Sequence, residues 1–182
     1  DQCAGARFPM ANDVKVKVEF NPARSAEYRL IGDETRALRR EDFNNDRVDA
    51  GEIGAGHTVT AIYEVTPVGS DAVLSDPLRY GGAVQGDPGA EIGFLKLRYK
   101  APGEGVSQLI ETPLPDVSTL GQEAQFATAV AGFAQLLRGE SQMLEWDYSD
   151  AIALATGAKG EDPFGYRAEA ISLMRLANSL SQ

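Results

Sequence analysis

The first two-thirds of the chain alternate apolar and polar side chains with a period of two residues. In one early segment, lysines and a glutamate separate the apolar residues Val14, Val16, Val18 and Phe20. Successive side chains of a β-strand point to opposite faces of a sheet, so the pattern predicts a strand with its valine face buried. The strand is expected to end at Asn21-Pro22, where both residue types favour a turn.

Four later segments show related strand patterns. They are Glu27–Ile31, Thr58–Val65, Phe94–Lys100 and Val106–Thr112. Stretches rich in glycine, aspartate and proline separate them, as expected of loops, and Pro102–Gly105 predicts a hairpin between the last two. In Phe94–Lys100 the apolar side chains are expected inward and the basic ones outward. No helical pattern lies between the strands, which favours an antiparallel sandwich or barrel, and we predict a sandwich from about Ala6 to Thr112.

Near Pro115 the apolar period changes from 2 to 3.6 residues, which indicates helices. The first is predicted over residues 122–138, and it ends before Gly139. Its apolar stripe is formed by Phe126, Val130, Phe133 and Leu137. A shorter helix is predicted over residues 149–156, with Ile152 and Ala155 inward.

A third helix is predicted over residues 163–180. Asp162 suits the N-cap and Pro163 the first helical position, where its missing N–H costs nothing. The stripe expected to be buried consists of Tyr166, Ala170, Leu173, Ala177 and Leu180. Arg167 is then free to bond a carbonyl or carboxylate of the preceding β part.

The two patterns together predict an α+β fold, in which an antiparallel β-sandwich is followed by a C-terminal bundle of about three helices. We place residues 1–115 in the β-sandwich part and residues 116–182 in the helical part of one module. The 182 residues include 43% hydrophobic residues, enough for a core.

Charge argues against two classes of partner. The chain has 27 acidic and 17 basic side chains and a net charge of −10. This field repels nucleic-acid phosphates and anionic lipid headgroups, so we expect no nucleic-acid partner. No apolar run approaches the length of a membrane-spanning helix, so we also expect no direct membrane insertion.

The residue types that carry most catalysis are scarce. His57 is the single histidine and Cys3 the single cysteine, which disfavours nucleophilic triads and zinc sites. Gly51, Gly54 and Gly56 have the composition of a phosphate-binding loop, but a predicted strand follows them instead of a helix. We therefore predict no enzymatic activity, no catalytic residue and no cofactor.

One acidic stretch, Asp42–Glu52, partly matches a calcium-binding loop. Asp42, Asn44 and Asp46 stand at ligand positions 1, 3 and 5, but Arg47 replaces the glycine at position 6 and Ile53 the glutamate at position 12. We predict a solvated loop without tight calcium binding. In the alternative, a calcium- or glycan-binding β-sandwich, the metal ligands are Asp42, Asp46, Asp49 and Glu52.

Several longer runs resemble a known family. They are Val18–Pro22, Glu27–Gly32, Glu41–Asp46, Asp49–His57, Leu95–Lys100 and Lys159–Glu169. From about Phe8 to Leu180, the chain resembles the C-terminal domain, of unknown function, of bacterial proteins that contain a von Willebrand factor type A domain. The resemblance implies a parent protein in which the type A domain, with its metal site, precedes this region. It implies no catalytic residue.

We therefore expect a non-enzymatic accessory module that mediates protein–protein interaction or scaffolding. Its expected partners are the adjacent type A domain of the parent chain and an unidentified protein, and its expected location is the bacterial cell envelope. Two other classes stay open: the calcium- or glycan-binding sandwich of the envelope, and a hydrolase that uses two facing carboxylates.

Overall fold

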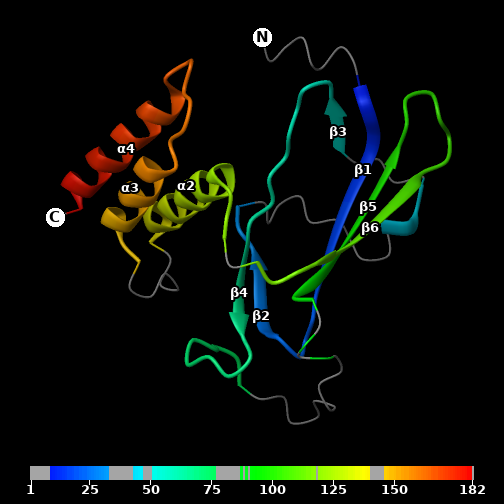
Figure 1. The fold of residues 1–182 in the computed structure, drawn as a ribbon, viewed down its shortest axis with the longest axis horizontal. Helices are drawn as coiled ribbons and strands as arrows, with labels where there is room; N and C mark the ends of the chain where they lie inside the picture. The colour runs from blue at the N-terminus through cyan, green and yellow to red at the C-terminus, as the bar shows by residue number, and fades with distance from the viewer. Residues whose placement is uncertain are drawn as a thin grey trace. The chain divides into compact units, whose positions relative to one another are not determined.

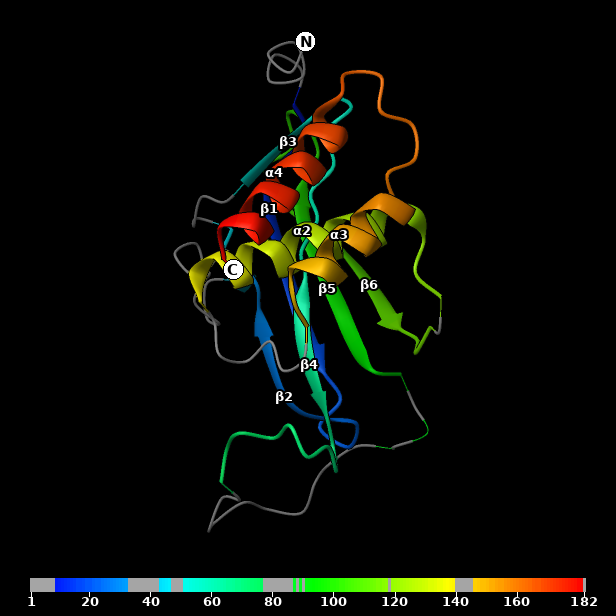
Figure 2. The same cartoon turned by 90° about the vertical axis from the view of Figure 1, so that its left-hand side faces the viewer.

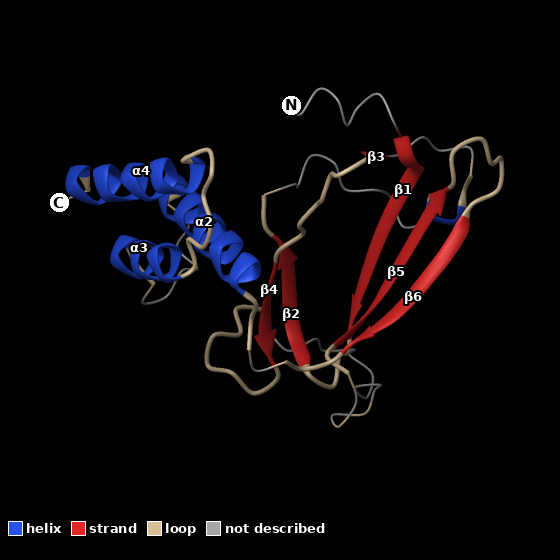
Figure 3. Ribbon diagram, turned by 45° about the horizontal axis from the view of Figure 1, so that its top comes forward, coloured by secondary structure: helices blue, strands red, loops and turns tan. Residues whose placement is uncertain are grey.

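The computed structural model describes residues 9–32, 43–46, 51–76, 87, 89, 91–117, 119–139 and 146–181. It divides the chain into two compact units. Asp1–Asp116 is called the β unit here, and Val117–Gln182 the helical unit (Figure 1). Among the described residues, strands occur only in the β unit and α-helices only in the helical unit; the short blue segment of the β unit in Figure 3 is a 3₁₀ turn at Phe43–Asn44.

The described strands of the β unit form two antiparallel sheets. Their bounds are β1 Pro9–Phe20, β2 Ser25–Leu30, β3 Gly51–Gly54, β4 Tyr63–Pro67, β5 Gly93–Lys100 and β6 Gln108–Leu114. The larger sheet has the order β3-β1-β5-β6, and the smaller pairs β2 with β4. The hairpin expected around Pro102–Gly105 joins β5 to β6.

The two sheets meet through aromatic side chains where β1 ends. The Phe20 ring centroid lies 4.6 Å from that of Tyr28 on β2 and 5.4 Å from that of Tyr63 on β4. A turn beginning at Asn21 leads from β1 into β2, and the Asn21 side chain accepts a hydrogen bond from the Ala23 amide. This turn brings the smaller sheet against the end of the larger one.

Strand β1 departs from the burial expected of its alternation. Its pairing with β5 shifts register between Asn12 and Lys15, where Asp13 has a φ of 51°. Lys15, on the polar face, is only 3% exposed, whereas Val16 on the opposite face is 48% exposed. The expectation of a buried valine face was therefore wrong for Val16, because a loop segment covers the polar face of the strand instead.

The helical unit contains three described helices, α2 Gln122–Arg138, α3 Tyr148–Gly157 and α4 Tyr166–Leu180. Helix α3 packs against both α2 and α4, as Figure 2 shows. The core is formed by Ala129, Ala155, Ile171 and Met174, with phenylalanines of α2 packed at its border. Antiparallel sheets followed by C-terminal helices confirm the predicted α+β fold. No described helix combines the length and apolarity needed to cross a membrane.

The buried faces of two helices differ from the predicted stripes. In α4 the core residues are Ile171 and Met174, while Tyr166, Leu173 and Leu180 of the expected stripe are exposed. In α2 the buried positions are Ala129, Gly132 and Gln135, and Val130 and Leu137 are exposed. Both helices have apolar residues over a wider arc than their neighbours cover, so the apolar pattern alone did not identify the covered side.

Helix α4 begins later than predicted. Its N-cap is Gly165, with a φ of 76°, and not Asp162. The carbonyl of Asp162 accepts the Gly165 amide at 3.1 Å, so that Pro163 lies in a turn before the helix. The Asp162 carboxylate still accepts the amides of Ala168 at 2.9 Å and Arg167 at 3.3 Å. Asp162 thus caps the first turn from three residues upstream of the N-cap position.

Candidate functional site

The four candidate calcium ligands are only partly within the described residues. Asp42 and Asp49 lie outside them. Asp46 ends the short segment Phe43–Asp46, and Glu52 lies exposed on β3. The site can therefore be tested at Asp46.

The Asp46 carboxylate is bound by side chains of β5 and of the hairpin that follows it. Ser107 donates its hydroxyl to Asp46 Oδ1 at 2.7 Å, and Arg98 Nη2 lies 3.4 Å from the same oxygen. Lys100 donates to the Asp46 carbonyl at 2.9 Å. The hydrogen bond from Ser107, assisted by the charges of Arg98 and Lys100, lowers the pKa of Asp46. These neighbours compete directly with a divalent cation for the same oxygens.

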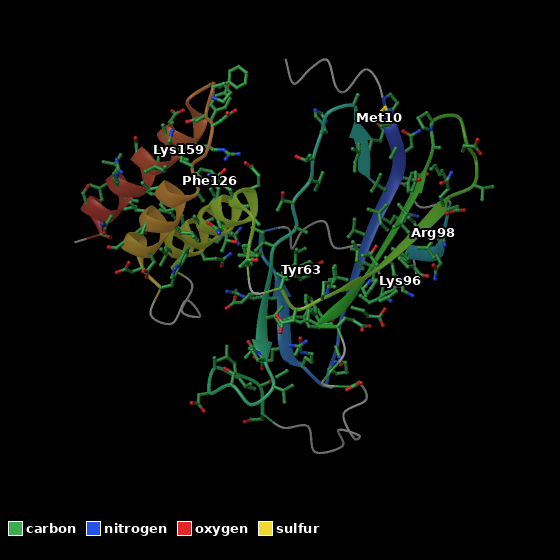
Figure 4. The ribbon with its side chains drawn as sticks, in the orientation of Figure 1. Met10, Tyr63, Lys96, Arg98, Phe126 and Lys159 are labelled. Carbon is green, nitrogen blue, oxygen red and sulfur yellow. The ribbon has the colours of Figure 1, made fainter. Side chains whose placement is uncertain are left out.

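Further cation contacts hold the segment Phe43–Asp46 against the polar face of the larger sheet. Lys15 donates to the Asn45 carbonyl at 2.5 Å, and Arg98, labelled in Figure 4, donates to the Asn44 side chain at 3.2 Å. Phe43, in the same segment, is buried. We call Lys15, Arg98, Lys100, Asp46 and Ser107 the anchor cluster.

The anchor cluster has the properties of a structural contact. Within the described ranges, no three His, Cys, Asp or Glu side chains group as metal ligands. Lys100 also forms an ion pair with Asp13, the residue with positive φ on β1. In the sequence, the anchor cluster was indicated by the row of basic residues on β1 and β5. We had expected these residues to face solvent.

Only the end of the glycine-rich segment before His57 forms a turn, because Gly51 and Gly54 lie in strand β3. The His57 amide donates to the Gly54 carbonyl at 3.1 Å, and Gly56 has a φ of 76°. That conformation is costly for residues with a Cβ atom and ordinary for glycine. His57 itself is exposed, and Cys3 lies outside the described residues.

A second candidate site is an apolar row along the exposed side of α4. Tyr166, Leu173, Leu176 and Leu180 are 69%, 53%, 55% and 78% exposed, and Glu169, also exposed, lies between them in the row. Along the helix these five residues follow each other at intervals of three, four, three and four. That spacing places them on one narrow stripe. We call these five residues the α4 face.

The inner side of α4 is fixed by a separate set of contacts. Arg167 pairs with Glu123 of α2 at 2.5 Å and donates to the Lys159 carbonyl at 2.9 Å. Its guanidinium lies 4.9 Å from the ring centroid of Phe126, which Figure 4 labels together with Lys159. The hydrogen bond between Arg167 and Glu123 raises the pKa of Arg167 and lowers that of Glu123. Arg167 therefore joins α4 to α2 and to the segment before α4 within the helical unit.

The α4 face is left out of this network. No ion pair or side-chain hydrogen bond of Glu169 is formed with any described residue. Within the run Lys159–Glu169, Asp162 caps the first turn of α4 and Arg167 joins α4 to α2. The site adjacent to this run was missed because its leucines were assigned to the core.

Within the described residues, the fold is that of an α+β domain in which two antiparallel sheets precede three helices. The chain belongs to the family described as "Uncharacterized protein YfbK, C-terminal", whose model matches residues 5–180. It is 44% identical over 176 residues to the uncharacterized protein YfbK of Escherichia coli (strain K12). That match covers 94% of this chain and 30% of the relative, so the chain corresponds to a C-terminal part of a larger bacterial protein. No solved structure matches the chain.

Proposed function

We propose that this chain is a non-enzymatic accessory domain that mediates protein–protein interaction through the α4 face. Its first partner in this proposal is a von Willebrand factor type A domain in the same parent protein. The observation that carries the proposal is the α4 face itself, where four large apolar side chains are more than half exposed along one helix.

Physical chemistry supports a docking role for such a row. Single exposed apolar side chains are normal on soluble proteins, but contiguous ones are a feature of interaction surfaces. Burying the row against a partner removes apolar area from water, and each leucine contributes in proportion to the area it loses. The helix that presents the row is fixed from behind by Ile171, Met174 and Arg167, so docking requires little ordering of the backbone.

The anchor cluster does not favour the calcium-binding alternative. At Asp46 the carboxylate is bound by Arg98, and Lys100 and Lys15 bond the backbone carbonyls of Asp46 and Asn45, so three cationic side chains surround this candidate ligand. We therefore propose the interaction module alone.

The test is titration calorimetry between the 182-residue chain and the type A domain of the parent protein. We expect binding by the native chain and loss of binding by the double variant Leu173→Ser, Leu176→Ser. Val106→Ser is the control, because Val106 is an apolar residue in the hairpin of the β unit and, at 74%, is even more exposed than the two leucines.

Circular dichroism on each preparation separates a lost surface from a lost fold. Native-like affinity in a folded double variant would show that the α4 face is not the docking surface. Absence of binding by the native chain would remove the type A domain as the partner.

A further inference from the structure

We propose that the α4 face binds one amphipathic α-helix of a partner protein, and that this helix carries a lysine or arginine that pairs with Glu169. This inference rests on the proposed function and adds the chemistry of the partner. Its starting point is the combination of a narrow apolar row with one carboxylate that has no partner among the described residues.

The spacing of the row indicates a helix as the occupant. Intervals of alternately three and four residues are the seam along which two helices pack with their side chains interdigitated. A broader apolar arc is typical of packing against a sheet or a globular core. Helix α4 has 15 residues, so the seam is about 21 Å long and matches a partner helix of about four turns. The small side chains of Ala170 and Ala177 lie beside the seam and permit a close approach.

Glu169 determines the charge of that partner. It occupies a seam position between Tyr166 and Leu173, so a docked helix desolvates its carboxylate. A buried carboxylate is costly unless a cation pairs with it. The helix itself supplies none, because Arg167 is held by Glu123 and Arg175 lies about 120° around the helix from Glu169.

The same charges argue against a second copy of this chain as the occupant. A symmetric pair would bring a second Glu169 to the seam and no cation on it. The net charge of −10 adds repulsion between copies and attraction toward a basic partner. Charge complementarity therefore favours a basic amphipathic helix from another protein segment.

The experiment uses two synthetic 18-residue helical peptides with identical leucine seams. One carries lysine at the position that meets Glu169, and the other carries glutamate there. Fluorescence anisotropy with the full 182-residue chain should give at least about tenfold tighter binding of the lysine peptide. Glu169→Lys should reverse the preference. Glu104→Lys is the matched control, because it makes the same charge change at an exposed site in the β unit and should leave the preference as it is.

Four outcomes would overturn the inference. These are binding to neither peptide, equal binding to both, a preference that Glu169→Lys leaves unchanged, and a concentration-dependent dimer that Leu173→Ser, Leu176→Ser abolishes. Failure of the proposed function is distinguishable from these. If the lysine peptide binds as expected but the type A domain does not, the chemistry of the partner stands and its identity changes. If the type A domain binds through the α4 face without a role for Glu169, the proposed function stands and this inference fails.

Discussion

At the residue scale, Gly132 has a role that its place inside a helix does not suggest. A Cβ atom added at Gly132 would lie 1.4 Å from Cζ3 and 2.2 Å from Cη2 of Trp146. Glycine inside a helix costs about 1 kcal/mol relative to alanine. The close approach of the indole ring is the physical reason for glycine here, since no larger residue leaves room for the ring.

We predict that Gly132→Ala displaces Trp146 and destabilises the helical unit by about 1–3 kcal/mol, the usual cost of overpacking. Trp146 is the single tryptophan of the chain, so its fluorescence emission should shift to longer wavelength. Gly157→Ala is the control, because a Cβ atom there meets nothing within 4 Å. It should leave the emission as it is and keep or raise the melting temperature. A more stable Gly132→Ala protein with native emission would contradict the prediction.

Asp46 allows a test of the calcium question at one residue. We predict that calorimetric titration of the native chain with calcium gives no tight binding, because Ser107 and Arg98 already bind the carboxylate. Asp46→Ala should lower the melting temperature, since the segment Phe43–Asp46 then loses the hydrogen bond from Ser107 and the ion pair with Arg98. Micromolar calcium affinity that disappears in Asp46→Ala would refute this.

At the scale of elements, the sequence predicted where strands and helices form better than what covers them. Alternation identified β1 and β5, and the helical period identified α2 with its observed bounds. Lys15 was predicted on the exposed face but is buried, because the segment that covers it is 30 residues away in sequence and has no periodic pattern of its own. Cross-chain contacts of this kind depend on the tertiary fold, and no local signal specifies them.

Helix α4 shows the same limit for the candidate site. It has two adjacent apolar rows, one with Ile171 and Met174 and the other with the leucines of the α4 face. Periodicity predicts both equally well. The positions of α2 and α3 determine that the first row is covered, and the exposed row could not be recognised before that packing was known.

We predict that Asp162→Ala lowers the melting temperature at pH 7 by removing the acceptor for the first amides of α4. The hydrogen bond from the Ala168 amide is the largest of the effects that lower the pKa of Asp162. A lowered folded-state pKa stabilises the fold above the unfolded-state pKa, and this contribution is lost as the pH falls through the folded-state value. The difference between native and variant melting temperatures should therefore shrink toward pH 3.

Circular dichroism at 222 nm follows the thermal unfolding of each variant at each pH. Glu161→Ala is the control, because this neighbouring acid is exposed and outside the cap. If Asp162→Ala lowers the melting temperature by the same amount at pH 7 and pH 3, the cap does not depend on the charge of the Asp162 carboxylate.

At the scale of the whole molecule, both units depend on ionised carboxylates. Hydrogen bonds lower the pKa of Glu27, mainly through the Ser75 side chain, and Asp46 is lowered in the same unit. In the helical unit the pKa values of Glu123 and Asp162 are lowered. All four pKa shifts are downward, so the contributions of these carboxylates to stability are present at neutral pH and are lost together in acid.

We therefore predict that the melting temperature falls steeply below about pH 4, the range in which unfolded-state carboxylates take up protons. Differential scanning calorimetry from pH 7 to pH 3 measures this. The loss should remain at high ionic strength, because most of these contacts are short hydrogen bonds rather than distant charge interactions. A melting temperature that is the same at pH 3 and pH 6 would contradict the prediction.

The burial of Lys15 beneath the segment Phe43–Asp46 makes its amine a natural reporter for chemical labelling. Lys15 is 3% exposed, whereas the side chain of Lys17, two residues along the same strand, is 30% exposed. An amine-acylating reagent should modify Lys17 rapidly and Lys15 only when the covering segment lifts. The ratio of the two labelling rates, read by mass spectrometry, then measures how often this part of the native protein opens, without any substitution.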